Sequence, residues 1–187
     1  RLLVVADGVG GWNEKGVDPA IYAKELCQNI EMNYKDKCLE DYLEEKKQDI
    51  NEIYLKKLFI QSVAQTKSVG SSTCTILHLD KQFLYSVYIG DSCYMILRQK
   101  DNKYYLVFKS EEQVHSFNMP YQVGYTGDRP DKAKTQKHQV EMKDIIILAT
   151  DGLWDNLPTE EIIKIVNENQ KASELKNEDL NSLASEL

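Results

Sequence analysis

Two apolar runs along the chain each end abruptly at an aspartate followed by a glycine. Leu2–Ala6 runs into Asp7–Gly8, and Ile145–Ala149 runs into Thr150–Gly152. Short runs rich in valine, isoleucine and leucine are typical of strands, and Asp-Gly commonly opens a turn after a strand. The pattern therefore predicts two buried strand ends, each of which carries one carboxylate into a tight turn.

Apolar residues recur at helical spacing in four other segments. In the first of them, Tyr22, Leu26 and Ile30 fall on one face, which is typical of a helix that covers a sheet. The segments that we expect to be helical are Asp18 to about Tyr34, Ile50–Lys67, Thr159 to about Glu168, and a final amphipathic stretch, Leu175–Leu187. The charged run Lys35–Asp49 is expected to be a solvated helix face or a surface insertion.

Short turns divide the middle of the chain into segments that suit strands. The expected strands are Thr73–Leu79, Gln82–Ile89, Cys93–Arg98 and Lys103–Lys109. Their short connections predict an antiparallel meander. A long polar loop, Ser110–Lys137, with room for one short helix, is expected to follow. We then expect a further hairpin, formed by His138–Met142 and Asp144–Thr150.

The order of these elements indicates the fold class. Helices are grouped apart from strands, which favours an α+β fold of two packed antiparallel β-sheets flanked by helices, an α-β-β-α sandwich. A doubly wound parallel sheet is disfavoured because strands and helices do not alternate. We expect one domain over residues 1–187. Because the chain enters a strand directly after Arg1, we also expect this domain to be incomplete at both ends.

Composition narrows the classes of function. The chain has 187 residues, of which 42% are hydrophobic and 28% charged, and a formal net charge of -7. This acidity argues against a nucleic-acid binder, which normally carries a basic stripe. No apolar run is long enough to span a membrane. Four cysteines without a C-x-x-C spacing favour neither a zinc site nor a disulfide framework, so an intracellular location, mitochondrial or cytoplasmic, is expected.

A third aspartate, Asp91, stands at another expected strand end. Carboxylates at strand ends are costly unless a cation or hydrogen bonds satisfy them. If Asp7, Asp91 and Asp151 meet at one edge of the sandwich, they form an acidic cluster that suits magnesium or manganese. Two such ions would activate a water for attack on a phosphate. For each motif alone, the simpler interpretation is a turn after a strand.

Four motifs in order resemble the metal-dependent 2C-type (PPM family) serine/threonine protein phosphatases. The matching residues are Val5–Trp12, Gly70–Thr73, Ile89–Ser92 and Ala149–Asn156. Val9, Trp12 and the stretch His115–Gln122 resemble more specifically the branch that includes organellar members. The resemblance implies the same helix-flanked sandwich and hydrolysis of phosphoserine and phosphothreonine on proteins.

The resemblance also implies roles for individual residues. Asp7 would bridge two Mg²⁺ or Mn²⁺ ions, the Gly8 carbonyl would bind one of them, and Asp151 would bind the other. Asp91 and Asp155 match the acids that in some relatives help to hold a third, weaker ion. Asp155 is equally well explained as a plain turn or cap residue.

The sequence departs from the family pattern in two respects. Many relatives have a histidine, proposed as a general acid, where Val9 stands here, so leaving-group protonation is expected to come from water or another group. The family's first and last strands, with their acidic ligands, are absent from these residues. We therefore expect the 187 residues alone to bind metal weakly and to be poorly active.

Two alternatives to an active phosphatase stay open. One is a catalytically silent phosphatase-like module that binds a phosphoprotein or another partner. The other is an unrelated acidic cluster that binds calcium, which is disfavoured because the regular twelve-residue calcium loop is missing.

Three histidines need separate interpretations. His78 alternates with apolar residues on an expected strand, so a structural role is favoured, and His138 is expected to be exposed. His115 lies in the long loop, where a contact with substrate is the hypothesis to test.

Overall fold

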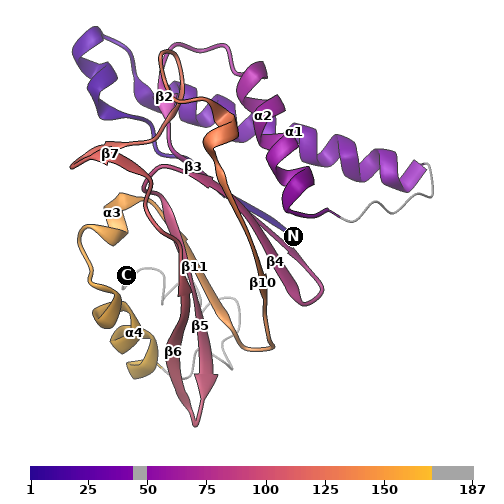
Figure 1. Ribbon diagram of the computed structural model, residues 1–187, viewed down its shortest axis with the longest axis vertical. Coiled ribbons are helices and arrows are strands. Elements are labelled where there is room, and N and C mark those ends of the chain that lie inside the picture. Colours follow the sequence, from indigo (N-terminus) through magenta and orange to yellow (C-terminus); the bar gives the residue numbers. More distant parts are fainter. Residues whose placement is uncertain (44–49, 170–187) are drawn as a thin grey trace. The chain divides into compact units, whose positions relative to one another are not determined.

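The computed structural model describes residues 1–43 and 50–169, which form two compact units. The first unit contains Arg1–Ser92 and Glu112–Gln139, and the described part of the second contains Cys93–Glu111 and residues 140–169 (Figure 1). The single-domain organisation expected for residues 1–187 stays a prediction.

The first unit is built on a four-stranded antiparallel sheet in the order β1-β3-β4-β10. Its strands are β1 (Leu2–Val5), β3 (Cys74–Asp80), β4 (Phe83–Ile89) and β10 (Lys134–Gln139). β1 is an edge strand and only half-buried, and the other predicted strand end, β11 (Ile145–Ala149), is also only half-buried, so the expected burial of both was wrong. The hairpin expected after the long loop was also wrong, because β10 pairs with β4 instead of with the strand that follows it.

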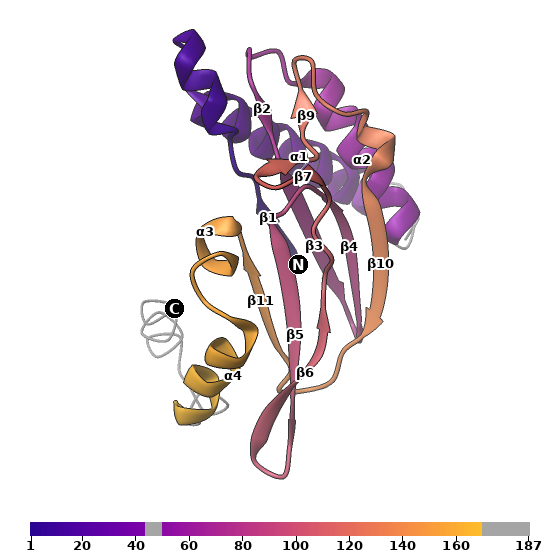
Figure 2. The ribbon, with the colours of Figure 1, turned by 60° about the vertical axis from the view of Figure 1, so that its left-hand side comes forward.

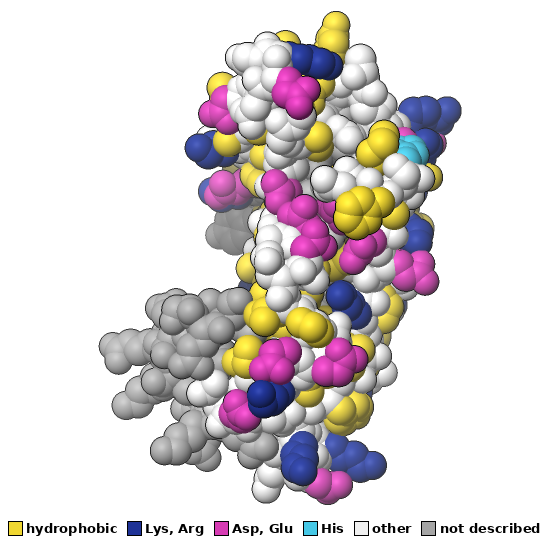
Figure 3. All heavy atoms as spheres, turned by 90° about the vertical axis from the view of Figure 1, so that its left-hand side faces the viewer, with side chains coloured by type: hydrophobic (Ala, Val, Ile, Leu, Met, Phe, Trp, Pro, Cys, Tyr) yellow, Lys and Arg dark blue, Asp and Glu magenta, His cyan; other side chains and the backbone are white. Residues whose placement is uncertain are grey.

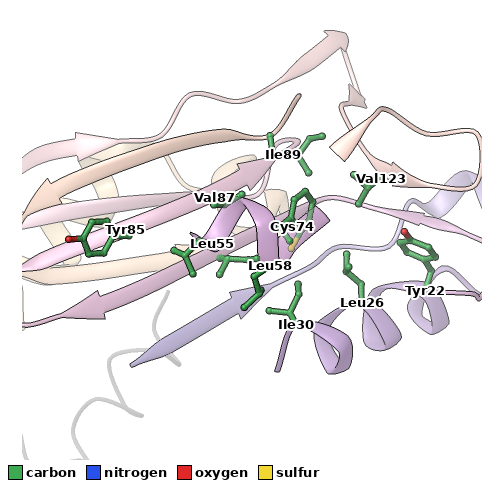
Figure 4. Close-up of a cluster of buried hydrophobic side chains, with 13 residues drawn as sticks. Tyr22, Leu26, Ile30, Leu55, Leu58, Cys74, Tyr85, Val87, Ile89 and Val123 are labelled. Atoms are coloured by element: carbon green, nitrogen blue, oxygen red, sulfur yellow. The ribbon is translucent and has the colours of Figure 1, made fainter. Parts of the chain in front are cut away.

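Two helices cover one face of this sheet, as Figure 2 shows. They are α1 (Pro19–Leu43) and α2 (Glu52–Gln65), and Figure 4 shows their apolar side chains packed on the strands. The helical stripes predicted from sequence are confirmed as core. The buried cluster contains Tyr22, Leu26, Ile30, Leu55, Leu58, Phe59, Ile76, Val87 and Ile89.

Helix α1 continues nine residues past its expected end at Tyr34. Lys35 pairs with Glu31 one turn earlier, at 2.5 Å, and such pairs four residues apart support an exposed helix face. The charged run is therefore helical to Leu43, and its remainder lies outside the described residues.

The second unit has a three-stranded antiparallel sheet in the order β11-β5-β6. The strands are β5 (Cys93–Lys100), β6 (Lys103–Lys109) and β11 (Ile145–Ala149), and the helices are α3 (Asp151–Trp154) and α4 (Thr159–Glu168). Trp154, Ile162 and Val166 pack on the strands around Met95 and Leu97. Helix α4 has the predicted bounds, and the expected segment Leu175–Leu187 lies outside the described residues.

The four-stranded meander expected in the middle of the chain was wrong, because β3 and β4 pair in one sheet and β5 and β6 in the other. The chain leaves the first sheet at Gly90, whose φ of 98° is accessible mainly to glycine. β5 is apolar on both faces, so its alternation could not show which neighbour it would choose.

The long loop contains short elements. They are β7 (Val114–Ser116), β8 (Met119–Pro120), β9 (Val123–Gly124) and the 3₁₀ helix η2 (Pro130–Lys132). β7 and β8 form a hairpin, whereas β9 pairs with β2 (Ser71–Ser72). A further 3₁₀ helix, η1 (Gly10–Lys15), follows the first Asp-Gly turn. Among the described helices, none combines the length and apolarity that crossing a bilayer requires.

The carboxylate of Glu25 joins α1 to the connection after α2. It accepts hydrogen bonds from the hydroxyl and backbone N–H of Ser68 and from the backbone N–H of Lys67, at 2.9 and 3.0 Å for the two amides. The Ser68 hydroxyl, followed by the Lys67 amide, lowers the pKa of Glu25 below its ordinary value. Ionised Glu25 therefore stabilises the folded state.

Glu25→Gln should destabilise the protein at neutral pH by about 1 kcal/mol, because a charge-assisted acceptor is lost. Since the pKa falls on folding, the contribution of Glu25 is complete above its unfolded-state pKa and disappears as the pH falls through the lowered folded-state value. Urea unfolding at a series of pH values should show the variant and the wild type converging in acid. A stability difference that stays constant down to the lowest pH would contradict this role.

Candidate metal centre

The first predicted acid, Asp7, follows β1 at a point where its backbone is held by the segment before β3. Its carbonyl accepts hydrogen bonds from the Thr73 amide (3.0 Å) and the Ser72 hydroxyl (2.8 Å), and its amide donates to the Thr73 hydroxyl (3.3 Å). Both backbone polar groups of Asp7 are thus fixed by two small hydroxylic residues. The side chain of Asp7, which is half-buried, starts from a defined position.

Gly8 passes very close to the start of α1. A Cβ atom at this position would lie 2.3 Å from the carbonyl oxygen and 2.6 Å from the carbonyl carbon of Pro19. Since both atoms belong to the backbone, no rotamer change can relieve the clash. Glycine is therefore required here for close packing, a reason that the Asp-Gly motif did not reveal.

Asp91 lies in a turn that is attached to the same segment. The hydroxyls of its neighbour Ser92 and of Thr73 are 2.7 Å apart, and the Thr75 hydroxyl donates to the Ser92 carbonyl at 2.6 Å. Thr73 therefore contacts both the backbone of Asp7 and the residue after Asp91. The structure brings these two predicted turns together within the first unit.

The other two predicted acids, Asp151 and Asp155, belong to the second unit. Asp151 is the first residue of α3, separated from the end of β11 by one residue, where the sequence predicted a turn. Asp155 ends this short helix and is exposed, and its amide donates to the Asp151 carbonyl at 2.8 Å. The Trp154 indole donates to the Ala149 carbonyl at 2.8 Å, which fixes the helix against its strand.

The chemistry of these ligand atoms fits hard divalent cations, since carboxylate and carbonyl oxygens are the ligands that magnesium and manganese prefer. Within residues 1–43 and 50–169, no group of three or more histidine, cysteine or acidic side chains is arranged to hold a metal ion. The ligand set Asp7, Gly8, Asp91, Asp151 and Asp155 therefore stays a prediction.

His115 is exposed but held within its loop. Its Nε2 atom lies 2.8 Å from an Asp128 carboxylate oxygen, and its ring stacks on Tyr121 with centroids 4.0 Å apart. Burial raises the pKa of Asp128, but the hydrogen bonds from Lys132 and His115 outweigh it, so this pKa lies below its ordinary value. A contact between His115 and substrate stays a prediction.

The hairpin beside His115 presents apolar side chains to solvent. Phe117 is 99% exposed, and Val114 and Met119 are also exposed. Figure 3, which views the molecule from the side of this hairpin, shows hydrophobic side chains beside a histidine at the surface.

The other two histidines are packed side chains. His78 is buried, its Nδ1 atom lies 3.2 Å from the Tyr34 hydroxyl, and burial lowers its pKa to about 4. The structural role predicted for His78 is confirmed. The expected exposure of His138 was wrong, because this residue is half-buried on β10 and burial lowers its pKa.

The sequence interpretation missed a chain of hydrogen bonds beside the Asp7 turn. The Trp12 indole N–H donates to the Ser71 hydroxyl at 2.6 Å, and this hydroxyl donates to the Gln122 side-chain carbonyl at 2.5 Å. The sequence analysis assigned no contact to Ser71. The indication available from sequence was that all three residues fall in motifs with family resemblance.

Comparison with known proteins gives a family match over almost the whole chain. The model of a family described as "Protein phosphatase 2C" matches residues 1–185. The chain is 39% identical over 168 residues, 89% of its length, to "Probable protein phosphatase 2C 55" of Arabidopsis thaliana. It spans 33% of that protein's length.

Solved structures confirm the fold class. The photosystem II phosphatase PBCP is 28% identical with a TM-score of 0.75, and the match covers 89% of this chain and 61% of PBCP. The catalytic domain of the serine/threonine protein phosphatase PstP, in complex with two manganese ions, is 18% identical with a TM-score of 0.64 and shows the fold alone. That match covers 98% of this chain and 80% of the PstP chain. The predicted α+β class with antiparallel sheets and flanking helices is therefore confirmed.

Proposed function

Because the chain belongs to the protein phosphatase 2C family, we propose that it removes phosphate from phosphoserine and phosphothreonine residues of proteins. The observation that carries this proposal is the family match over residues 1–185, which includes all four motifs predicted from sequence. The attachment of the Asp7 and Asp91 turns to Thr73 supports it.

The proposed cofactor is a pair of Mg²⁺ or Mn²⁺ ions, with a third as a weaker addition. Asp7, the Gly8 carbonyl and Asp151 are the proposed ligands of the pair, and Asp91 and Asp155 those of the third ion. Such ions, when bound, lower the pKa of a coordinated water and neutralise charge on a phosphate ester. PstP, described with two manganese ions, is a precedent for a pair of ions in this fold.

The chain's own residues supply the positions of these ligands. Ser72 and Thr73 hold the Asp7 carbonyl, so this backbone group is already satisfied and the carboxylate remains the ligating group. Val9 follows the Asp-Gly pair, and its apolar side chain cannot transfer a proton. Protonation of the leaving serine or threonine oxygen therefore falls to water or to another residue.

The proposed substrate is a phosphorylated protein that is recognised by local contacts. A net charge of -7 repels acidic phosphopeptides at long range, so recognition is assigned to the loop 110–137. The four cysteines, Cys27, Cys38, Cys74 and Cys93, form no disulfide, which supports an intracellular location, in the cytoplasm or an organelle.

The test is hydrolysis of a phosphothreonine peptide by the full natural chain with manganese, and again after removal of the metal by EDTA. We expect phosphate release with manganese, none with EDTA, and recovery when manganese is added back. A folded protein that binds the phosphopeptide without releasing phosphate would instead support the silent binding module. A phosphotyrosine peptide is the matched control for substrate class.

A further inference from the structure

Three segments that are far apart in sequence meet beside the proposed metal ligands. Gly8 forms a bridge with Ser72, and the Val9 amide donates to the Ser71 carbonyl at 3.0 Å. On its other side, β2 pairs with β9, and Figure 2 shows these two strands side by side. The two-residue strand β2 therefore connects the Asp7–Gly8 turn directly to the long loop.

A side-chain contact strengthens this connection. The Ser71 hydroxyl receives a hydrogen bond from the Trp12 indole and donates to the side-chain amide oxygen of Gln122 at 2.5 Å. Ser71 is 1% exposed, so its hydroxyl depends on protein partners instead of bulk water. Gln122 supplies the acceptor for that hydroxyl from the long loop.

Gln122 is itself held by the loop around it. Its side-chain amide donates to the Pro120 carbonyl at 3.2 Å, and its backbone amide donates to the Asp128 carboxylate at 3.3 Å. The same carboxylate accepts from Lys132 at 2.8 Å and contacts His115 at 2.8 Å. Asp128 thus fixes the part of the loop from which Gln122 reaches Ser71.

We infer that Gln122 is a positioning residue for the Asp7–Gly8 turn. Gln122 holds the side chain of Ser71, whose backbone carbonyl binds the Val9 amide. The two residues after Ser71 in turn bind the backbone carbonyl of Asp7. The inference rests on the proposed function only where it extends to metal affinity. Substitution of a residue that holds a metal ligand in position, without binding the metal itself, typically changes the metal affinity by about 10- to 100-fold.

The decisive variants are Gln122→Leu and Gln122→Glu. Both substitutions remove the side-chain amide that donates to the Pro120 carbonyl, so this loss is common to the two variants. Leucine also removes the acceptor, whereas glutamate keeps an oxygen that the Ser71 hydroxyl can reach. Gln122 is half-buried and lies outside the two buried hydrophobic clusters, so neither change removes core packing. Gln28→Leu, the same change on an exposed part of α1, is the matched control.

The first measurement is amide hydrogen exchange in metal-free protein. Gln122→Leu should speed the exchange of the Val9 and Thr73 amides about tenfold. Because this opening is local, the exchange rates of the β4 amides should not change. Gln122→Glu and Gln28→Leu should exchange like the wild type. Unchanged Val9 and Thr73 amides in Gln122→Leu, or equally fast exchange in the leucine and glutamate variants, would overturn the inference.

The second measurement is manganese affinity by calorimetry. Gln122→Leu should weaken binding about tenfold, and Gln122→Glu should restore it. Ser71→Ala should weaken binding at least as much as the leucine variant, because it also removes the acceptor of the Trp12 indole. Adding Gln122→Leu to Ser71→Ala should cause little further loss, because the contact between these two residues is already broken. Additive losses would overturn the inference. If the wild type binds no manganese while the exchange result holds, the proposed metal site fails and the positioning role of Gln122 stands.

Discussion

Asp7→Asn and Asp151→Asn should each reduce manganese-dependent hydrolysis of a phosphothreonine peptide by about 10³-fold or more. Divalent ions supply several kcal/mol of charge stabilisation, and every 1.36 kcal/mol corresponds to a factor of ten in rate. Asparagine has the shape of aspartate but lacks the charge that holds the ion. Steady-state kinetics over a range of manganese concentrations checks the prediction.

The control for these two variants is Asp101→Asn. Asp101 lies in the turn between β5 and β6, outside the proposed ligand set, and has a φ of 50°, which asparagine tolerates. The Asp101→Asn substitution removes the same charge at a position outside the proposed metal site, so the activity of this variant should equal that of the wild type. Full activity of Asp7→Asn or Asp151→Asn would exclude that residue as an essential ligand, and equal losses in all three variants would indicate a general charge effect.

Gly8→Ala should destabilise the first unit and abolish manganese binding. The added Cβ would lie 2.3 Å from the Pro19 carbonyl oxygen, so either the turn or the start of α1 must move. Inserting a methyl group into a close-packed position typically costs about 1–3 kcal/mol. Urea unfolding gives the stability change, and calorimetry gives the manganese affinity.

Gly11→Ala is the matched control, because a Cβ at Gly11 would meet no atom within 4 Å. This variant should keep the stability and manganese affinity of the wild type. Equal stability and affinity in the Gly8 and Gly11 variants would show that close packing at Gly8 does not shape the turn. Asp7→Asn changes the charge of a proposed ligand but not its shape, whereas Gly8→Ala changes the packing of the turn but not its charge. Comparing the two variants therefore distinguishes loss of a ligand from distortion of the turn.

Several local features were determined by the sequence. The stripe of Tyr22, Leu26 and Ile30 predicted a core-facing helix, and the structure buries all three. Helix α4 has its predicted bounds, because the proline at its start and the apolar spacing are local signals. The four motifs and their order were enough to identify the family that the comparisons confirm.

Only the tertiary structure decided which strands are neighbours. β5 follows β4 after three residues, yet it pairs with β6 and β11. Alternation of apolar residues reports which faces are buried, but the partner of a strand depends on segments distant in sequence. The unexpected half-burial of His138 has the same origin, since β10 packs beside β4 instead of forming the expected hairpin.

The environment of the candidate ligands was likewise decided by long-range contacts. The sequence placed Asp7 and Gly8 at a strand end. It did not reveal the proximity of Gly8 to Pro19 or the hydrogen bonds between Asp7 and Thr73, 66 residues away. The contact between Ser71 and Gln122 spans 51 residues. The sequence by itself therefore determined the family and the candidate ligands, whereas the fold alone determined what holds them, because hydrogen bonds and close packing join groups that the chain separates.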